Sequence, residues 1–200
     1  EIYQCDWSSD VCSSDLMNIS WVVADDTFLA PDINIEQLKG VGSIWGSWKT
    51  WRSCQTDNVI CSDIGQAREL IQRNFNNICN FFVPKDAFVD LDRPPKVQLF
   101  DGKFNFEIDR PDELITLHLA ASRSDIVLLL GFDWQPKDKK PDRLQEHRAQ
   151  NYYTGVKHVI KDNPTTQWVL IDHPDSILTE LVKLDNLTRD TLANVLEMLG

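Results

Sequence analysis

Five short apolar runs divide the chain, and the segments between several of them carry apolar residues at helical spacing. The runs cover residues 19–24, 58–61, 80–83, 125–130 and 167–171. Short apolar runs rich in β-branched and aromatic residues are typical of strands buried on both faces, as in a parallel sheet. The pattern therefore predicts strands that alternate with helices along the chain.

The first helix is predicted after residue 63. Asp63 stands three residues before Gln66, which is the spacing of a capping box. The apolar residues that follow at helical period are Ile64, Ala67, Leu70, Ile71, Phe75 and Ile78. Four further helices are predicted over residues 111–122, 144–160, 176–184 and 188–199, and the last one places Leu192, Val195, Leu196 and Leu199 on one stripe.

A hairpin is predicted around residues 101–102. Val97–Phe100 and Lys103–Ile108 both alternate in polarity, and Asp101-Gly102 joins them. An Asp-Gly pair suits the positive φ angles of a type I′ turn. The predicted fold class is therefore a three-layer, Rossmann-like α/β fold, with a mainly parallel sheet and an antiparallel β-hairpin at its edge.

Residues 1–16 differ from the rest of the chain. They carry four acidic residues and no basic one, and they lack the basic start and apolar core of a signal peptide. The stretch resembles translated sequencing-adapter read-through at the ends of metagenomic gene models, and Met17 follows it directly. We expect an extraneous, disordered tail followed by a single domain over residues 17–200; a native disordered tail is the alternative.

Composition narrows the classes of function. The apolar fraction of 42% and the charged fraction of 26% are typical of a globular protein. A formal net charge of -11 argues against a nucleic-acid partner, because such binding needs clustered Lys and Arg. No apolar run approaches the roughly 20 residues that span a bilayer, so no membrane association is expected. Cys54, Cys61 and Cys79 form no Cys-x-x-Cys pair, which favours reduced thiols, no zinc site and a cytoplasmic location.

Polar residues follow three of the predicted strands. Asp25 and Asp26 follow the first, Asp133 follows the run 125–130, and Asp172 and His173 follow the run 167–171. In an open parallel sheet, ligands bind outside the carboxyl ends of the strands. We expect Asp133 and His173 to share one cleft there as catalytic residues, with Asp172 as a binding residue. The alternative is that the carboxylates cap the following loops and that the imidazole lies at the surface.

The segment from Gly40 to Arg52 is the second candidate for ligand binding. Its small residues would let backbone amides approach a phosphate, which Lys49 and Arg52 could neutralise while Trp45 or Trp48 stacks on a base or sugar. The candidate small residues are Gly42, Ser43, Gly46 and Ser47. The alternative is a helix packed on the sheet, because Trp45, Trp48 and Trp51 recur every three residues.

The second half of the chain resembles a known group of proteins. Residues 124–134 (SDIVLLLGFDW) resemble the strand ending in Gly-x-Asp of bacterial sialyltransferase-like proteins and archaeal-type hydroxymethylpterin pyrophosphokinases. A helix containing Tyr152 and Tyr153 follows in the same order, and residues 57–63 are similar to their strand that runs into an Asp, here Asp63, before a helix. The resemblance implies a nucleotide-sugar or nucleotide-phosphate substrate, with His173 nearest the catalytic base.

Two functions remain open. The first is a transferase that uses a nucleotide or a nucleotide sugar, for which the candidate cofactor is a nucleotide with a divalent metal. The second is a non-catalytic, Rossmann-like module of viral origin that binds a partner. The sequence does not identify the oligomeric state.

Overall fold

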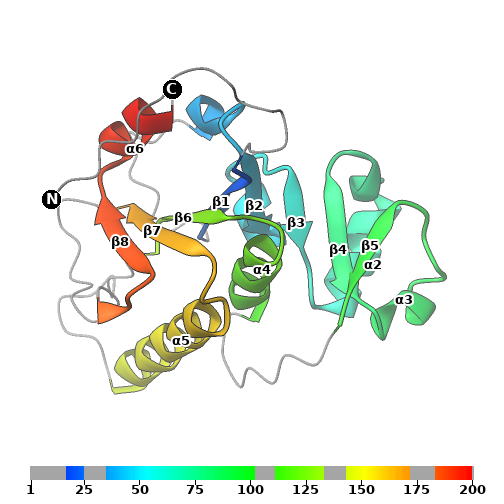
Figure 1. Cartoon of the computed structure of the whole chain (residues 1–200). Helices are drawn as coiled ribbons and strands as arrows, with labels where there is room; N and C mark the ends of the chain where they lie inside the picture. Colours follow the sequence, from blue (N-terminus) through cyan, green and yellow to red (C-terminus); the bar gives the residue numbers. More distant parts are fainter. Residues whose placement is uncertain (1–16, 25–34, 102–110, 133–142, 172–182, 200) are drawn as a thin grey trace, which may run out of the picture.

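A computed structural model describes residues 17–24, 35–101, 111–132, 143–171 and 183–199 (Figure 1). Residues 1–16 lie outside these ranges. Within the ranges, the strands form one eight-stranded sheet in the order β5-β4-β3-β2-β1-β6-β7-β8, and every pairing is parallel. The strands are β1 (Ile19–Val23), β2 (Ser43–Ser47), β3 (Asn58–Ile60), β4 (Asn80–Pro84), β5 (Val97–Phe100), β6 (Ile126–Leu130), β7 (Gln167–Ile171) and β8 (Leu187–Asp190).

The predicted three-layer α/β fold with a mainly parallel sheet is confirmed. All five apolar runs of the sequence form strands, namely β1, β3, β4, β6 and β7. The central strand β1 is paired on both sides, with Trp21 opposite Ile44 of β2 and Leu128 of β6. Strands in this position need apolar side chains on both faces, which explains why a continuous apolar run marks each of them.

The strand order reverses at β1. Strands β2 to β5 succeed one another on one side of β1, and β6 to β8 succeed one another on the other side. In doubly wound sheets such a reversal opens a crevice outside the carboxyl ends of the two strands, because the connections leave them toward opposite faces. The ends of β1 and β6 therefore form the switch point of this fold.

Helices cover both faces of the sheet (Figure 1). One face carries α4 (Pro111–Ala121) and α5 (Arg143–Asp162), which contribute Leu117 and Val156 to the largest core cluster. The elements that pack on the other face are η1 (Ile35–Leu38), α1 (Trp48–Trp51), α2 (Ile64–Gln72), η2 (Phe75–Asn77), α3 (Ala87–Asp90) and α6 (Leu192–Leu199). No described helix has the length and apolar character needed to cross a membrane.

Alternation along the strands divides the core into these two layers. In β1, Val22 belongs to the cluster under α4 and α5, whereas Trp21 and Val23 belong to the cluster under α6. A third cluster lies under α2 and α3 and includes Phe75 and Phe81. Successive side chains of a strand point to opposite faces, so each strand serves both layers.

The predicted antiparallel hairpin is not supported. Val97–Phe100 does form a strand, β5, but its partner is β4, and the two run parallel. The proposed second arm, residues 103–108, lies outside the described residues. Alternating polarity is typical of a strand with one exposed face, but it carries no information on strand direction.

Two predicted helices begin or end elsewhere. Residues 187–190 form β8 instead of the start of the last helix, and the Thr191 hydroxyl accepts the Asn194 N–H, which marks Thr191 as the cap of α6. The predicted stripe of α6 is confirmed, since its apolar residues pack in one cluster. Helix α2 ends at Gln72 because Asn74 adopts a φ of 60°, and Ile78 is consequently 63% exposed.

Candidate functional site at the carboxyl edge of the sheet

Backbone hydrogen bonds fix the switch point at the carboxyl edge of the sheet. The Ala24 N–H donates to the Leu130 carbonyl at 3.0 Å, so β1 and β6 stay paired up to their ends. Gly131 then turns with a φ of 78°, and the Phe132 side chain is buried in the core. The backbone is therefore fixed at the point from which a ligand-binding loop would start.

The three predicted site residues that follow β6 and β7 lie outside the described residues; these are Asp133, Asp172 and His173. The prediction of a shared cleft assumed that the strands before these residues are parallel. This is the case, because β6 and β7 are neighbouring parallel strands with Leu129 opposite Leu170. The described carboxyl ends of these two strands consequently lie at the same edge of the sheet. Their shared cleft remains a prediction.

Ser47 lies at this edge, where it begins a helix. Its hydroxyl accepts the N–H groups of Lys49 at 3.1 Å and of Thr50 at 3.3 Å, which makes it the N-cap of α1. The Thr50 hydroxyl donates to the carbonyl of Val23 at 3.4 Å and so ties α1 to β1. The amides that would hold a phosphate at this position are thus occupied by the protein's own side chain.

Trp48 and Arg52 contact each other at the start of α1. The Arg52 guanidinium lies 4.3 Å from the centre of the Trp48 ring, within the range of a cation–π interaction. Trp48 is half-buried and packs against the cluster under α2 and α3. One face of the indole is therefore covered by arginine, and a base that stacked on that face would have to displace it.

The structure places Gly42 and Ser43 at the opposite edge, where β2 begins. The Ser43 hydroxyl lies 3.0 Å from that of Ser20, which in turn lies 2.5 Å from that of Ser124. The Trp45 indole N–H also donates to Ser43, at 2.8 Å. This chain of hydroxyls links three segments of the sheet, so Ser43 is structural, and the length of β2 separates it from Ser47.

Gly46 and the three tryptophans explain how this segment packs. A Cβ at Gly46 would lie 2.9 Å from the Thr50 Cβ, so glycine lets α1 fold closely over β2. Trp45 belongs to a strand and faces α4, whereas Trp48 and Trp51 lie in α1 on the other face. The three residues pack against the core, as the alternative interpretation expected, but they do not share one helix.

Carboxylates from two helix starts meet at this edge beside β3. The Asp63 Oδ1 accepts the Gln66 N–H at 2.7 Å and caps α2, as its spacing predicted. Asp112, in the first turn of α4, accepts the Ser62 N–H at 2.8 Å through its Oδ1. Glu113 follows it and is only 2% exposed. The carboxylates of Asp63 and Asp112 stabilise the local structure at the two helix starts and disfavour a phosphate beside β3.

Glu113 is buried because α4 packs on the sheet, and a local sequence pattern does not show this packing. Among the described residues, no group of three or more His, Cys, Asp or Glu side chains could hold a metal ion.

Two of the described cysteines, Cys61 and Cys79, are thiols of low reactivity. Burial raises the pKa of the Cys79 thiol to about 12. Burial and then the charge of Asp112 raise the pKa of Cys61 further still, although its thiol contacts the Asp63 carbonyl. Both groups are protonated at neutral pH, as expected for structural cysteines.

These thiols predict a loss of stability at alkaline pH. Above about pH 9 the cysteines ionise in the unfolded chain but keep their protons in the native state, so the free energy of unfolding falls as the pH rises toward the native pKa. Urea unfolding near pH 8 and near pH 10.5 should show a smaller fall for a Cys61→Ala/Cys79→Ala variant than for the unmodified protein. Equal falls in both proteins would contradict this assignment.

Comparisons with known proteins assign no family. No family model and no curated protein matches the chain. One solved structure, orotidine 5′-monophosphate decarboxylase from Metallosphaera sedula, aligns over 92% of this chain and 96% of that chain at 12% identity and a TM-score of 0.30. Similarity at that level carries no argument about function, so the α/β architecture itself is the starting point for a proposal.

Proposed function

We propose that the protein is an enzyme that transfers a group from a nucleotide or a nucleotide sugar bound at the switch point. The observation that carries the proposal is the reversal of strand order between β1 and β6. Ligands of open α/β sheets bind at such points, because the diverging connections leave a crevice there. Side-chain helix caps occupy the described ends of β2, β3 and β8, so these ends are less suited to a ligand than the switch point.

The chemistry of the site would come from the segments that follow the strands. Asp25 and Asp133 come shortly after the paired ends of β1 and β6, and His173 comes two residues after β7. An imidazole near neutral pKa is suited to accept a proton from an attacking hydroxyl group. We assign this general-base role to His173, with Asp133 holding the substrate or its metal ion.

The first test is ligand binding. A nucleotide or nucleotide sugar at about 100 times its Kd should add roughly 2.7 kcal/mol to the free energy of unfolding, seen as a rise of a few degrees in the melting temperature. Nucleoside di- and triphosphates and their sugar conjugates should be screened with and without Mg²⁺. The absence of any shift across the screen would contradict the proposal.

The second test is the role of His173. With a substrate from the screen, His173→Ala should lower kcat by about 10²–10⁴-fold, because general-base catalysis contributes that much. His158→Ala is the matched control, since His158 is exposed on α5. Unchanged turnover in His173→Ala would remove the histidine from the mechanism.

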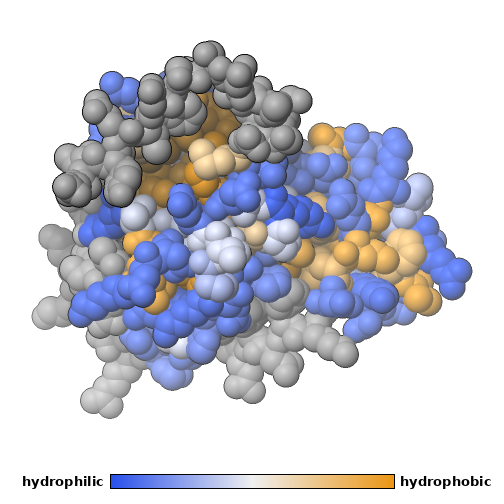
Figure 2. All heavy atoms as spheres, in the orientation of Figure 1, coloured by the Kyte–Doolittle hydropathy of each residue, from blue (hydrophilic) through white to orange (hydrophobic). Residues whose placement is uncertain are grey.

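One observation favours the alternative of partner binding. Strand β5 ends the sheet order of the described residues, and an edge strand can pair with a strand of another protein. Leu99 in β5 is 40% exposed and Val89 in α3 is 62% exposed, and apolar atoms gather at that end of the molecule (Figure 2). If the protein is a partner-binding module, nucleotides should not raise its melting temperature, and the Leu99→Lys variant should lose binding to the partner protein.

A further inference from the structure

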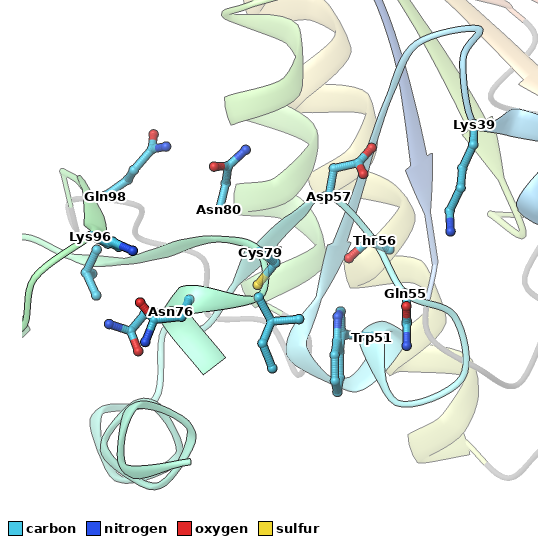
Figure 3. A pocket seen from close by; sticks show the side chains of 13 residues that line it. Lys39, Trp51, Gln55, Thr56, Asp57, Asn76, Cys79, Asn80, Lys96 and Gln98 are labelled. Carbon is cyan, nitrogen blue, oxygen red and sulfur yellow. The ribbon is translucent and has the colours of Figure 1, made fainter. Parts of the chain in front are cut away.

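A second site lies at the opposite edge of the sheet, where β3, β4 and β5 begin (Figure 3). An open cavity of about 680 Å³ is formed there by the segments that precede these three strands, together with Lys39 and Trp51. The strands are three to five residues long, and each residue adds about 3.3 Å. The cavity is therefore about 10–17 Å from the carboxyl edge and distinct from the proposed catalytic crevice.

Side-chain amides dominate the lining. Five carboxamides from three separate segments surround the space, and each can both donate and accept hydrogen bonds. They are Gln55, Asn76, Asn77, Asn80 and Gln98. A lining of this kind suits a ligand that carries several hydroxyl groups, because a hydroxyl group also donates and accepts.

Hydrogen bonds within the protein orient three of the lining polar groups. The Asn80 Nδ2 donates to the Asn58 Oδ1 at 3.1 Å, and the Asn76 Nδ2 donates to the Pro95 carbonyl at 2.8 Å. The Asp57 Oδ2 accepts the Ile44 N–H at 2.9 Å. Each bond uses only part of the capacity of its group, so the remaining donors and acceptors are held in fixed directions for a ligand.

Two lysines supply positive charge at the two ends of the cavity. Lys39 precedes β2 and Lys96 precedes β5, and Figure 3 shows them on opposite sides of the space. Lys96 adopts a φ of 59°, a conformation that is unfavourable for lysine. In a chain of net charge -11, this cavity brings two lysines together with one aspartate, Asp57.

An apolar wall completes the cavity. Trp51 lines it from α1 and is held by Phe75, with ring centres 4.4 Å apart in an edge-to-face arrangement. Ile78 also lines the cavity and is 63% exposed. Apolar side chains of this kind pack against the C–H faces of a sugar ring while amides bind its hydroxyl groups.

We propose that this cavity binds a phosphorylated sugar, whose hydroxyl groups contact the carboxamides and whose phosphate pairs with Lys39 or Lys96. The site goes beyond the transferase proposal, because it needs neither a nucleotide nor any residue of the carboxyl edge. A charged phosphate on lysine and fixed amides on the hydroxyl groups together give both affinity and selectivity.

The test is calorimetric titration of the full chain with glucose 6-phosphate, ribose 5-phosphate and fructose 6-phosphate, and with glucose and inorganic phosphate alone. We expect at least one sugar phosphate to bind at least tenfold more tightly than glucose and phosphate do. A Lys39→Gln/Lys96→Gln variant should weaken that binding at least tenfold. Lys85→Gln is the matched control, because Lys85 is exposed and follows β4 at the other edge. His173→Ala should bind normally, which keeps this test independent of the transferase proposal.

Lys96→Gly separates loss of binding from loss of folding. Glycine adopts a positive φ without strain, so the melting temperature should stay equal or rise while the affinity for the sugar phosphate falls. No binding by any of the three sugar phosphates would overturn the proposal. Unchanged affinity in the double lysine variant, or equal affinity for inorganic phosphate alone, would overturn it as well.

Discussion

Replacing Trp168 with alanine is expected to lower the free energy of unfolding by about 3–5 kcal/mol. Trp168 is fully buried in β7, a strand paired with β6 on one side and β8 on the other. It belongs to the cluster that joins α4 and α5 to the sheet, so truncation leaves a large cavity between two layers. Urea unfolding followed by circular dichroism measures the loss.

Trp168→Phe is the matched variant. The indole N–H of Trp168 has no hydrogen-bond partner among the described residues, and phenylalanine removes this buried donor while keeping most of the ring. The loss should therefore be about 1 kcal/mol or less. Met198→Ala, at a residue that is 69% exposed, should change stability by no more than about 0.5 kcal/mol. A similar loss in all three variants would contradict the packing described for β7.

Replacing Gly42 with alanine is expected to lower the free energy of unfolding by about 2–3 kcal/mol. A Cβ at Gly42 would lie 2.6 Å from the backbone oxygen of Ile19, a residue of β1. A backbone atom of a central strand cannot move away as the end of a flexible side chain can. The added methyl group must therefore push the start of β2 from β1, and thermal unfolding should show the loss.

Gly65→Ala is expected to raise the free energy of unfolding slightly or to leave it unchanged. Gly65 lies in α2, where alanine is the better helix former, and its Cβ would meet only the Asp63 carboxylate at 3.2 Å. The contact touches the cap of α2, so we expect a change between zero and a gain of about 0.5 kcal/mol. If Gly42→Ala lowered the free energy of unfolding no more than Gly65→Ala does, the description of the close approach between β2 and β1 would be wrong.

The sequence predicts the strands whose apolar character is continuous, and it misses those that depend on their neighbours. A run such as residues 126–130 is recognised as a strand from the sequence alone, because both faces of a central strand must be apolar. Residues 43–47 (SIWGS) lack such a run, since their small residues lie where other segments approach closely. Residues 187–190 (LTRD) are mostly polar and become a strand only because β7 offers a partner edge. Pairing across the sheet is not visible in local pattern.

The same limit applies to the sites. The sequence points to the carboxyl edge through polar residues that follow strands, and the capping role of Asp63 is confirmed. The cavity at the other edge was not predicted, because its lining residues come from separate segments that span about 60 positions of the chain. A usable signal did exist: Asp57, Asn80 and Lys96 each stand at the start of a strand, and amino ends of parallel strands also meet at one edge.

The position of β1 between β2 and β6 has a consequence for how the chain folds during synthesis. Asn18 and Asp125, which pair just before these strands, are 107 residues apart. At about 5–20 residues per second, the ribosome takes on the order of 5–20 seconds to deliver β6 after β1. Until then one edge of the central strand has no partner and can pair wrongly with another nascent chain. We therefore expect the yield of folded protein in cells to depend on chaperones that act early, and on the speed at which residues 24–126 are translated.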